Sequence, residues 1–335
     1  MNARKVLVTG GAGFIGSTLV KGLVSNGDQV RIIDNLWRGS LDNLRLADGQ
    51  FAVDLKTHFV QADLEDYSKC LEFIRDVDLV YHLADVVAGI DFVFGHEAFI
   101  FRQNLLINTN VLSACVLNGV PNYVYVGTAC SYPKHLQMRD GVVALLEDQA
   151  YPAEPESAYG WSKLMGEYEA ELALKSGSLN IGLLRLHNVY GPGASFEKTR
   201  SQVIPSLILR SIEHEEGPFI VWGSGQQYRD FVYVDDVIEA LLLVSQHGMN
   251  KGVIQIGSGI PITVRELAEK IVSVSGKKIA IVFDMGKPEG DRGRIAICER
   301  ARSILGWKPT TTFDTGIRTT FDWILEQRAR LRGAA

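Results

Sequence analysis

Short runs of β-branched and apolar residues alternate with longer stretches of helical periodicity through the first half of the chain. Such alternation predicts parallel strands joined by right-handed helical crossovers, with helices on both faces of one sheet. We expect strands at residues 5–9, 29–34, 57–61, 79–83, 123–127 and 181–186, and a helix at 14–26. The pattern therefore predicts an α/β fold built on a Rossmann-type, doubly wound parallel sheet.

The rhythm changes after Tyr190-Gly191-Pro192. Strands are expected at 219–222, 252–256 and 278–283, and helices at 203–214, 234–245, 263–275 and 313–328. We interpret residues 187–335 as a smaller mixed α/β lobe, partly interleaved with a sheet domain formed by residues 1–186. Because ligands of open α/β sheets bind beyond the carboxyl ends of the strands, the site is expected in the cleft between sheet and lobe.

Composition and charge exclude several classes of protein. Charged residues make up 22% of the chain and hydrophobic ones 46%, close to the average for globular proteins. The net charge is −5 and there is no long basic block, so nucleic acid is not an expected ligand. No apolar run approaches the roughly 20 residues that span a membrane, so a cytoplasmic protein without membrane partners is expected. The four cysteines are scattered without metal-ligand spacing, and neither disulfides nor a metal site is expected.

A glycine-rich turn lies at the first expected junction of strand and helix, with Gly10, Gly13 and Gly16 as its glycines. The first permits a tight turn, the second lets the backbone approach a pyrophosphate, and the third lets the helix pack closely on the sheet. The second strand ends at Asp34, where a carboxylate can bind both ribose hydroxyls of NAD and repel the 2′-phosphate of NADP. The sequence therefore predicts NAD as cofactor. Further expected cofactor contacts are Phe14, Ile15, Asn35, Arg38, Asp63, Leu64, Leu83 and Ala84.

Two of these cofactor contacts have a second interpretation. Arg38 follows Asp34 by four residues and would suit a 2′-phosphate, but an exposed loop arginine is the commoner case. Asp63 closes the third expected strand and would meet the adenine edge, or it simply caps a loop.

Tyr159 and Lys163 are four residues apart in an expected helix and therefore share one face. A free phenol has a pKa of about 10, and a nearby ammonium favours the phenolate. The pair is expected to supply a proton acceptor at neutral pH, the alternative being an ordinary surface tyrosine and lysine.

The combination of motifs resembles the extended short-chain dehydrogenases/reductases that act on nucleotide sugars. The resemblance covers nearly the whole chain and includes the glycine turn 9–16, His82-Leu83-Ala84, Gly127-Thr128-Ala129, Tyr159-x3-Lys163, 185–192, 229–236 and 305–309. It implies that Thr128 hydrogen-bonds the sugar hydroxyl that is oxidised, that Tyr159 removes its proton, and that Lys163 holds the nicotinamide ribose. It also implies a homodimer joined by helices around 105–117 and 158–174. The diphosphate would be held by Asn188, Arg229 and Arg292, since guanidinium groups suit phosphate oxygens.

The residues after Thr128 bear on the type of reaction. The 4,6-dehydratases of this family carry an acidic pair there, whereas this chain has Ala129 and Cys130. Segment 128–133 resembles the GDP-mannose 3,5-epimerase branch, in which the cysteine exchanges ring protons beside a 4-keto group. The alternative for Cys130 is a small buried apolar side chain. The same resemblance implies sugar contacts from Gly89, Ile90, Ala129, Val203 and Trp222.

Two positions depart from that branch. The branch has a second proton-transfer residue, a lysine, where this chain has Gln202 or Val203, although Lys198 and Arg200 are near in sequence. Asp85 stands where the family commonly has alanine, on the expected nicotinamide side of the cleft.

The leading hypothesis is an NAD-retaining nucleotide-sugar epimerase that acts through a transient 4-keto sugar, with a GDP-sugar favoured as substrate. Open alternatives are a 4-epimerase, a 4-oxidase or 4-keto reductase, and a non-catalytic NAD-binding scaffold. A 4,6-dehydratase is disfavoured by Ala129 and Cys130.

Overall fold

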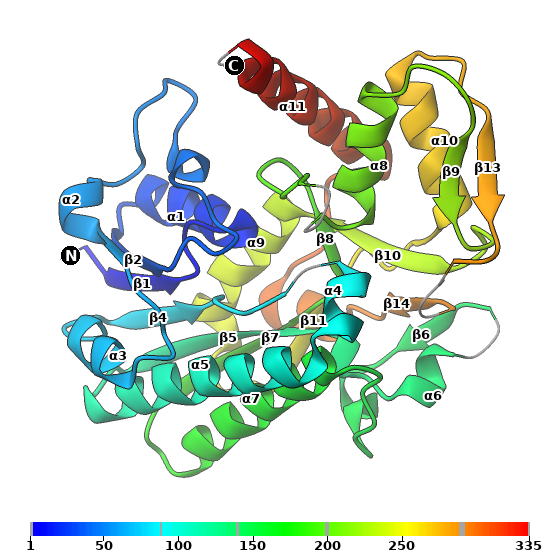
Figure 1. Ribbon diagram of the computed structural model, residues 1–335. Coiled ribbons are helices and arrows are strands. Elements are labelled where there is room, and N and C mark those ends of the chain that lie inside the picture. The colour runs from blue at the N-terminus through cyan, green and yellow to red at the C-terminus, as the bar shows by residue number, and fades with distance from the viewer. Residues whose placement is uncertain (1–2, 88, 139–140, 198–200, 288–291, 334–335) are drawn as a thin grey trace.

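The centre of the protein is a seven-stranded parallel sheet. The structure is a computed structural model that describes residues 3–87, 89–138, 141–197, 201–287 and 292–333. The strand order of the sheet is β11-β7-β5-β4-β1-β2-β3 (Figure 1). This arrangement confirms the predicted doubly wound sheet. The strands are β1 (Lys5–Thr9), β2 (Gln29–Asp34), β3 (Phe59–Gln61), β4 (Leu79–His82), β5 (Asn122–Thr128), β7 (Asn180–Leu186) and β11 (Val253–Ile256).

Helices cover both faces of the sheet, as Figure 1 shows. α1 (Phe14–Ser25) and α9 (Val234–Leu243) pack together on one face, and α3 (Tyr67–Phe73), α5 (Glu97–Leu117) and α7 (Ala158–Lys175) lie on the other. Successive strand side chains point to opposite faces, so Val6 and Val8 enter the core beneath α1 and α9, whereas Leu7 enters the core beneath α5 and α7. A strand that is buried on both faces must be apolar throughout, which explains the uninterrupted run of β1.

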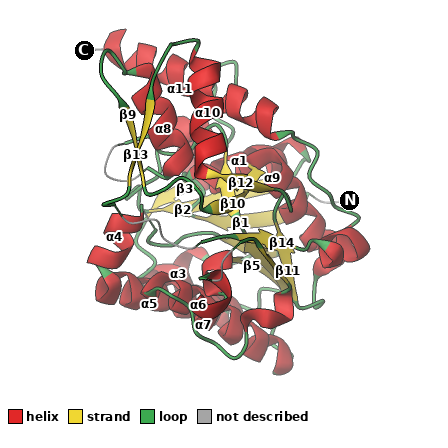
Figure 2. Cartoon of the chain, turned by 90° about the vertical axis from the view of Figure 1, so that its right-hand side faces the viewer, coloured by secondary structure: helices red, strands yellow, loops and turns green. Residues whose placement is uncertain are grey.

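A smaller lobe stands over the carboxyl ends of the strands and packs its helices against two small sheets (Figure 2). Its α10 begins with a capping box between Thr263 and Glu266 and ends at Gly276 in the left-handed conformation. The lobe consists of α8 (Val203–Ile212), α10 (Val264–Ser275), α11 (Phe313–Gly333), the sheet β12 (Pro261–Thr263), β10 (Tyr228–Tyr233) and β8 (Asn188–Tyr190), and the pair β9 (Phe219–Trp222) and β13 (Ile281–Asp284). β11, although late in sequence, joins the edge of the main sheet beside β7.

Short elements connect these parts. β6 (Val143–Leu145) pairs with β14 (Arg294–Ala296), which brings residues 294–296 beside the loops that follow β5. The others are α2 (Leu55–His58), α4 (Ile90–Gly95), α6 (Lys134–Gln137), the 3-10 turns η1 (Leu41–Leu44), η2 (Ala129–Ser131) and η3 (Glu147–Ala150), and the π-helical turns η4 (Val244–Gly248) and η5 (Ala301–Leu305).

Several predicted boundaries are wrong, including the end of the helix expected at 313–328, which continues to Gly333. The strand expected at 57–61 starts only at Phe59, because Asp54 caps a short helix by accepting a hydrogen bond from the Lys56 amide at 2.9 Å. The strand expected at 278–283 starts at Ile281, and the helix expected at 234–245 continues from Leu243 into a π-helical turn. Within the described ranges, no helix combines the length and apolar character that crossing a membrane would need.

Candidate active site

A cleft of about 1580 Å³ opens between the carboxyl ends of the strands and the smaller lobe. Pockets for a single small ligand usually measure roughly 300–1,000 Å³, so this cleft has room for a dinucleotide and a second ligand. All the residues expected to contact the cofactor line it: Gly10, Gly13, Phe14, Ile15, Gly16, Asp34, Asn35, Arg38, Asp63, Leu64, Leu83 and Ala84.

The glycine turn forms one end of this cleft. Gly10 has a φ of +69°, and a Cβ there would lie 2.9 Å from the Cα of Ala84, so the position requires glycine. α1 begins at Phe14 after Gly13, and no side chain of the described residues caps it. The amides of its first turn therefore face the cleft and suit a phosphate group.

Asp34 holds its carboxylate at the end of β2, beside the glycine turn. Its Oδ2 accepts from the Ala12 amide at 3.0 Å and its Oδ1 from the Leu36 amide at 2.8 Å. Burial raises the pKa of Asp34, and these backbone hydrogen bonds oppose that shift. Nearby, Arg38 Nη1 donates to the Val87 carbonyl at 2.9 Å. A fixed carboxylate and helix amides that face the cleft fit the ribose and pyrophosphate of a dinucleotide such as NAD.

Asp85 connects the two residues of the predicted proton-acceptor pair. The Tyr159 hydroxyl donates to Asp85 Oδ2 at 3.1 Å, and Lys163 Nζ lies 3.5 Å from the same oxygen. The Lys163 side chain is 3% exposed and that of Asp85 16% exposed, so solvent screens the group only weakly. α7 provides the tyrosine and the lysine in successive turns, and the loop after β4 provides the carboxylate.

Burial and Asp85 act on the pair in addition to the expected effect of the ammonium on the phenol. Burial, followed by the charge of Asp85, raises the pKa of Tyr159 well above its usual value. Burial lowers the pKa of Lys163, and Asp85 acts in the opposite direction. In this structure the Lys163 ammonium is paired with the Asp85 carboxylate, and the Tyr159 hydroxyl is hydrogen-bonded to the same carboxylate.

Thr128 and Cys130 lie at the end of β5, where the chain enters η2. The Thr128 Oγ1 accepts from the Cys130 amide at 3.2 Å, which leaves its hydroxyl proton available to a ligand. Arg294 Nη2 lies 3.6 Å from the Cys130 Sγ. The guanidinium is close enough to stabilise negative charge on the sulfur.

Gly160 lets α7 approach this turn. A Cβ at this position would clash with the carbonyl group of Cys130, whose carbon would be only 3.0 Å away. Ser157 caps α7 by accepting from the Gly160 amide at 3.2 Å. The helix that carries Tyr159 is therefore packed directly against the backbone of Cys130.

Two buried histidines lie close to the site, one with contacts at both ring nitrogens and one that lines the cleft. His82 lies between Thr9 Oγ1 at 2.8 Å and Asn108 Oδ1 at 3.0 Å, and burial lowers its pKa to about 3. His187 lines the cleft, and its Nε2 contacts Gln255 Oε1 at 3.2 Å.

Most of the residues expected to bind the sugar nucleotide line the cleft, namely Gly89, Asn188, Val203, Trp222 and Arg229. Two do not. Ala129 is buried in a small core beside Tyr132 and Leu164, because η2 turns its side chain inward. Arg292 is exposed outside the cleft, whereas Arg294 lines it, because β14 pairs with β6 there.

Some of the positions considered from the sequence lie outside the described residues: the side chain of Ile90, and all of Lys198 and Arg200. Gln202 and Val203 line the cleft at the start of α8.

Comparisons with known proteins find relatives that match most or nearly all of the chain. Residues 6–257 match the model of the NAD dependent epimerase/dehydratase family. GDP-mannose 3,5-epimerase 1 of Oryza sativa subsp. indica is 32% identical over 323 residues, which cover 96% of this chain and 82% of that protein. The crystal structure of UDP-glucose 4-epimerase with UDP-glucose from Thermotoga maritima has a TM-score of 0.83 at 28% identity, covering 97% of this chain and 99% of that one. The UDP-glucose 4-epimerase of Thermus thermophilus in complex with NAD has a TM-score of 0.82 at 28% identity, covering 96% and 99%.

Proposed function

This chain belongs to the NAD dependent epimerase/dehydratase family, and we propose that it is an NAD-retaining nucleotide-sugar epimerase that acts through a transient 4-keto sugar. One observation carries the proposal: Thr128, Cys130 and Tyr159 line the same cleft as the dinucleotide-binding residues. That cleft has room for a second ligand the size of a nucleotide sugar beside the cofactor.

In the proposed reaction the chain positions the sugar and moves its protons. Thr128 donates to the C4 oxygen of the sugar, and Tyr159 takes the proton of that hydroxyl. Lys163, one helical turn away from Tyr159, holds the nicotinamide ribose. When bound, NAD supplies the acceptor for the C4 hydride and returns it at the end of turnover. Because net redox is zero, the cofactor is expected to remain bound and to copurify.

Cys130 is proposed to exchange a ring proton while the sugar is a ketone. A 4-keto group acidifies the protons at C3 and C5, so a weak base suffices. The Arg294 guanidinium, 3.6 Å from the sulfur, supports this role because it stabilises negative charge there. A 4,6-dehydratase is disfavoured because neither Ala129 nor Cys130 can act as the carboxylic acid that eliminates water. The identity to the rice GDP-mannose 3,5-epimerase favours a GDP-sugar as substrate.

A 4-epimerase is the second candidate. Gln202 and Val203 line the cleft where the 3,5-epimerase branch is expected to have its second proton-transfer lysine. Inversion at a ring carbon needs a proton to leave from one face and return to the other, so the lack of this lysine favours a reaction confined to C4.

The test is incubation of the protein with GDP-, UDP-, ADP- and CDP-sugars in deuterated water, followed by NMR. Deuterium at C3 or C5 supports the 3,5-type reaction, a 4-epimer without label supports the second candidate, and accumulating NADH indicates an oxidase. Cys130→Ala should abolish the label but retain C4 oxidation. Cys298→Ala, which changes a buried thiol outside the cleft, is the matched control. No turnover with any sugar would leave the NAD-binding scaffold as the remaining alternative.

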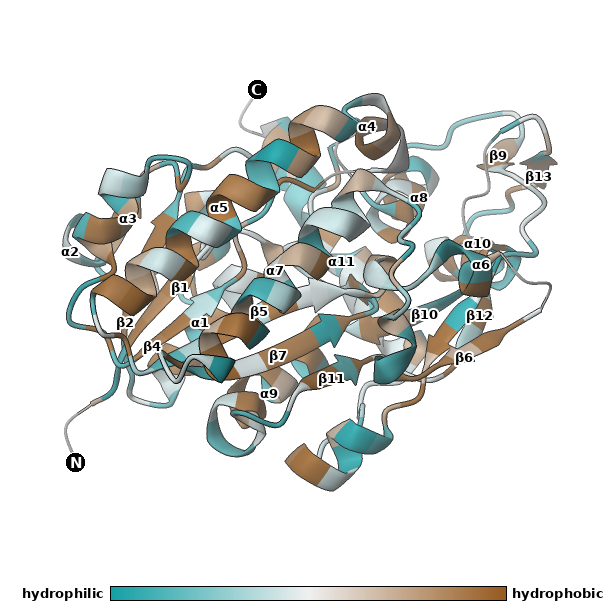
Figure 3. Cartoon of the chain, turned by 90° about the horizontal axis from the view of Figure 1, so that it is seen from below, coloured by the Kyte–Doolittle hydropathy of each residue, from teal (hydrophilic) through white to brown (hydrophobic). Residues whose placement is uncertain are grey.

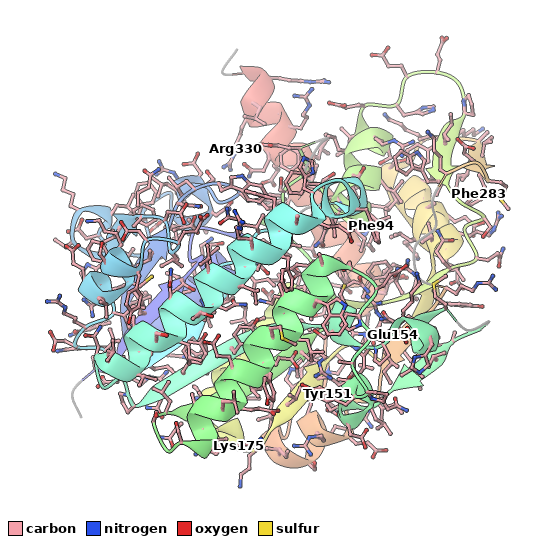
Figure 4. The ribbon with its side chains drawn as sticks, turned by 60° about the horizontal axis from the view of Figure 1, so that its bottom comes forward. Phe94, Tyr151, Glu154, Lys175, Phe283 and Arg330 are labelled. Carbon is pink, nitrogen blue, oxygen red and sulfur yellow. The ribbon has the colours of Figure 1, made fainter. Side chains whose placement is uncertain are left out.

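We also propose a homodimer formed through α5 and α7. Figures 3 and 4 show these helices side by side at the surface, with hydrophobic segments among hydrophilic ones. In Figure 4, Tyr151 precedes α7 and Lys175 ends it. The apolar residues exposed on the two helices are Phe99, Phe101, Leu106, Val116, Leu117, Tyr168 and Leu172. A second copy of the same face would cover them.

Light scattering after gel filtration tests the dimer. Leu172→Glu, on α7, should give a monomer. Leu325→Glu is the matched control, because Leu325 is similarly exposed (47% against 46%) but lies on α11. A monomeric wild-type protein would contradict the assignment.

A further inference from the structure

Asp85 has no assigned role in the proposed reaction, yet it contacts both Tyr159, which takes the C4 hydroxyl proton, and Lys163. Its Oδ2 accepts from Tyr159 at 3.1 Å and lies 3.5 Å from Lys163 Nζ. Both α7 residues therefore converge on one oxygen of a carboxylate that lines the same cleft.

We propose that Asp85 is the proton acceptor of Tyr159, so that the phenol relays the sugar proton to the carboxylate instead of acting as a phenolate. This role rests on the proposed function, because it assigns the route of the proton in C4 oxidation. Asp85 acts through Tyr159 and is a positioning and proton-storing residue rather than one that touches the sugar.

The relay balances atoms and charge. The O–H bond at C4 breaks as its proton passes to the Tyr159 oxygen, and the phenol proton moves to Asp85 Oδ2. The electron pair of the O–H bond forms the C=O bond, and the C4 hydride would be accepted by NAD bound as in the proposed function. On return the carboxyl proton passes back through Tyr159 to the C4 oxygen. The proton released in the first step is therefore still on the enzyme when the ketone is reduced.

The surroundings of the cluster favour a relay over a free phenolate. A phenolate at Tyr159 would lie 3.1 Å from a carboxylate of the same charge. The Lys163 ammonium instead attracts charge on Asp85, which favours return of the proton to the phenol when the reaction reverses. The other titratable groups that act on the cluster are His82 on β4, Tyr125 on β5, Cys130 on η2 and Glu167 on α7.

A titration of the protein without sugar tests the contact itself. The difference between the near-ultraviolet absorbance spectra of wild type and Tyr159→Phe reports the tyrosinate that forms at residue 159 alone. In wild type it should stay absent from neutral pH up to about pH 10, because burial and Asp85 raise the pKa of Tyr159. In Asp85→Asn it should appear at lower pH. Tyrosinate already present at pH 7 in wild type, or a titration unchanged in Asp85→Asn, would overturn the proposal.

Turnover of the nucleotide sugar identified in the NMR panel tests the relay. Asp85→Asn should lower kcat by about 10²-fold or more and change KM by less than about 3-fold, since general-base groups contribute roughly 10²–10⁴-fold. Asp85→Glu should restore part of kcat. Asp322→Asn, an exposed carboxylate on α11, is the charge control.

Thermal denaturation and NAD affinity of Asp85→Asn are measured alongside, so that misfolding is recognised. Full kcat in a folded Asp85→Asn overturns the relay. If wild type turns over no sugar, the proposed function fails, and the sugar-free titration still decides whether Asp85 holds Tyr159 as a phenol.

Discussion

Gly160→Ala tests whether the contact between α7 and η2 positions the reacting groups. The added Cβ would clash with the carbonyl oxygen of Cys130, its nearest neighbour, and would lie 3.0 Å from the carbonyl carbon of Cys130 and 3.0 Å from the Cβ of Pro155. Carbon atoms pack best at about 3.5–4.0 Å, so the helix and the turn must separate by roughly 0.5–1 Å. The obstacle on one side is backbone, which cannot rotate away as a side chain would. Tyr159, the preceding residue, must move with the helix.

The effect on stability should be modest and the effect on activity large. Alanine is favoured over glycine in a helix by about 1 kcal/mol, whereas overpacking costs about 1–3 kcal/mol. The net loss of up to about 2 kcal/mol corresponds to a fall in Tm of about 3 °C, at roughly 2.1 cal/mol/K per residue. A misplacement of about 1 Å at the reacting groups can lower the rate by about 10²-fold.

The assay compares kcat for the sugar that wild type turns over with the Tm from thermal denaturation. Gly95→Ala is the matched control, because a Cβ there meets no atom within 4 Å. If Gly160→Ala is as active as Gly95→Ala and has an unchanged Tm, close packing at this contact does not position Tyr159.

Three further predictions concern charge and pH. Asp34→Asn should weaken the binding of NAD about 10- to 100-fold, since a hydrogen bond to a charged group contributes about 1.5–3 kcal/mol. It should also reduce the preference for NAD over NADP. If calorimetry gives the same ratio of the two Kd values as in wild type, the prediction is wrong. Glu167→Gln should lower the free energy of unfolding, measured by urea denaturation, by about 3–5 kcal/mol. The reason is that Arg185, whose side chain is 1% exposed, would remain buried without the carboxylate that pairs with it. A loss below about 1 kcal/mol would argue against a structural role for this ion pair. Burial lowers the pKa of His82 from 6.5 to about 3. Between these values the unfolded chain binds the extra proton, so stability should fall as pH drops below 6.5, by up to about 1.4 kcal/mol per pH unit. His82→Gln should flatten that slope, whereas the exposed His247→Gln should not.

Features that depend on neighbouring residues in the sequence could be predicted. Gly10 and Asp34 follow from the order of strand, turn and helix, and the structure puts both in the cleft. Tyr159 and Lys163 follow from the helical repeat. The start of β3 could not be predicted in this way, because the β-branched run continues through residues that the Asp54 cap holds in a helix. The hydrophobic periodicity of a segment does not reveal a helix cap that gives the same residues another structure.

Features that depend on contacts between distant segments could not be predicted in the same way. Asp85 and Tyr159 are separated by 74 residues, and the loop that carries Asp85 has no regular pattern. Arg294 and Cys130 are separated by 164 residues and meet only because β14 pairs with β6. The resemblance to the family singled out Arg292 instead, two positions away. Only the strand pairing decides which of them lines the cleft.

The groups proposed to act at the two stages of the reaction, formation of the ketone and exchange of its ring protons, depend partly on different regions of the fold. The groups assigned to C4 oxidation, Thr128 and Tyr159, come from β5 and α7, which pack on each other within the sheet domain. Cys130, which is proposed to act on the ketone, also belongs to the sheet domain, but two features beside it do not: Arg294 comes from β14, and Gln202 with Val203, where the second acid/base group is missing, come from the start of α8. Changes in the smaller lobe can therefore alter the fate of the ketone while leaving its formation intact. Substituting Val203 with lysine is the direct experiment, and ring deuteration should increase in that variant if the missing acid/base group limits exchange.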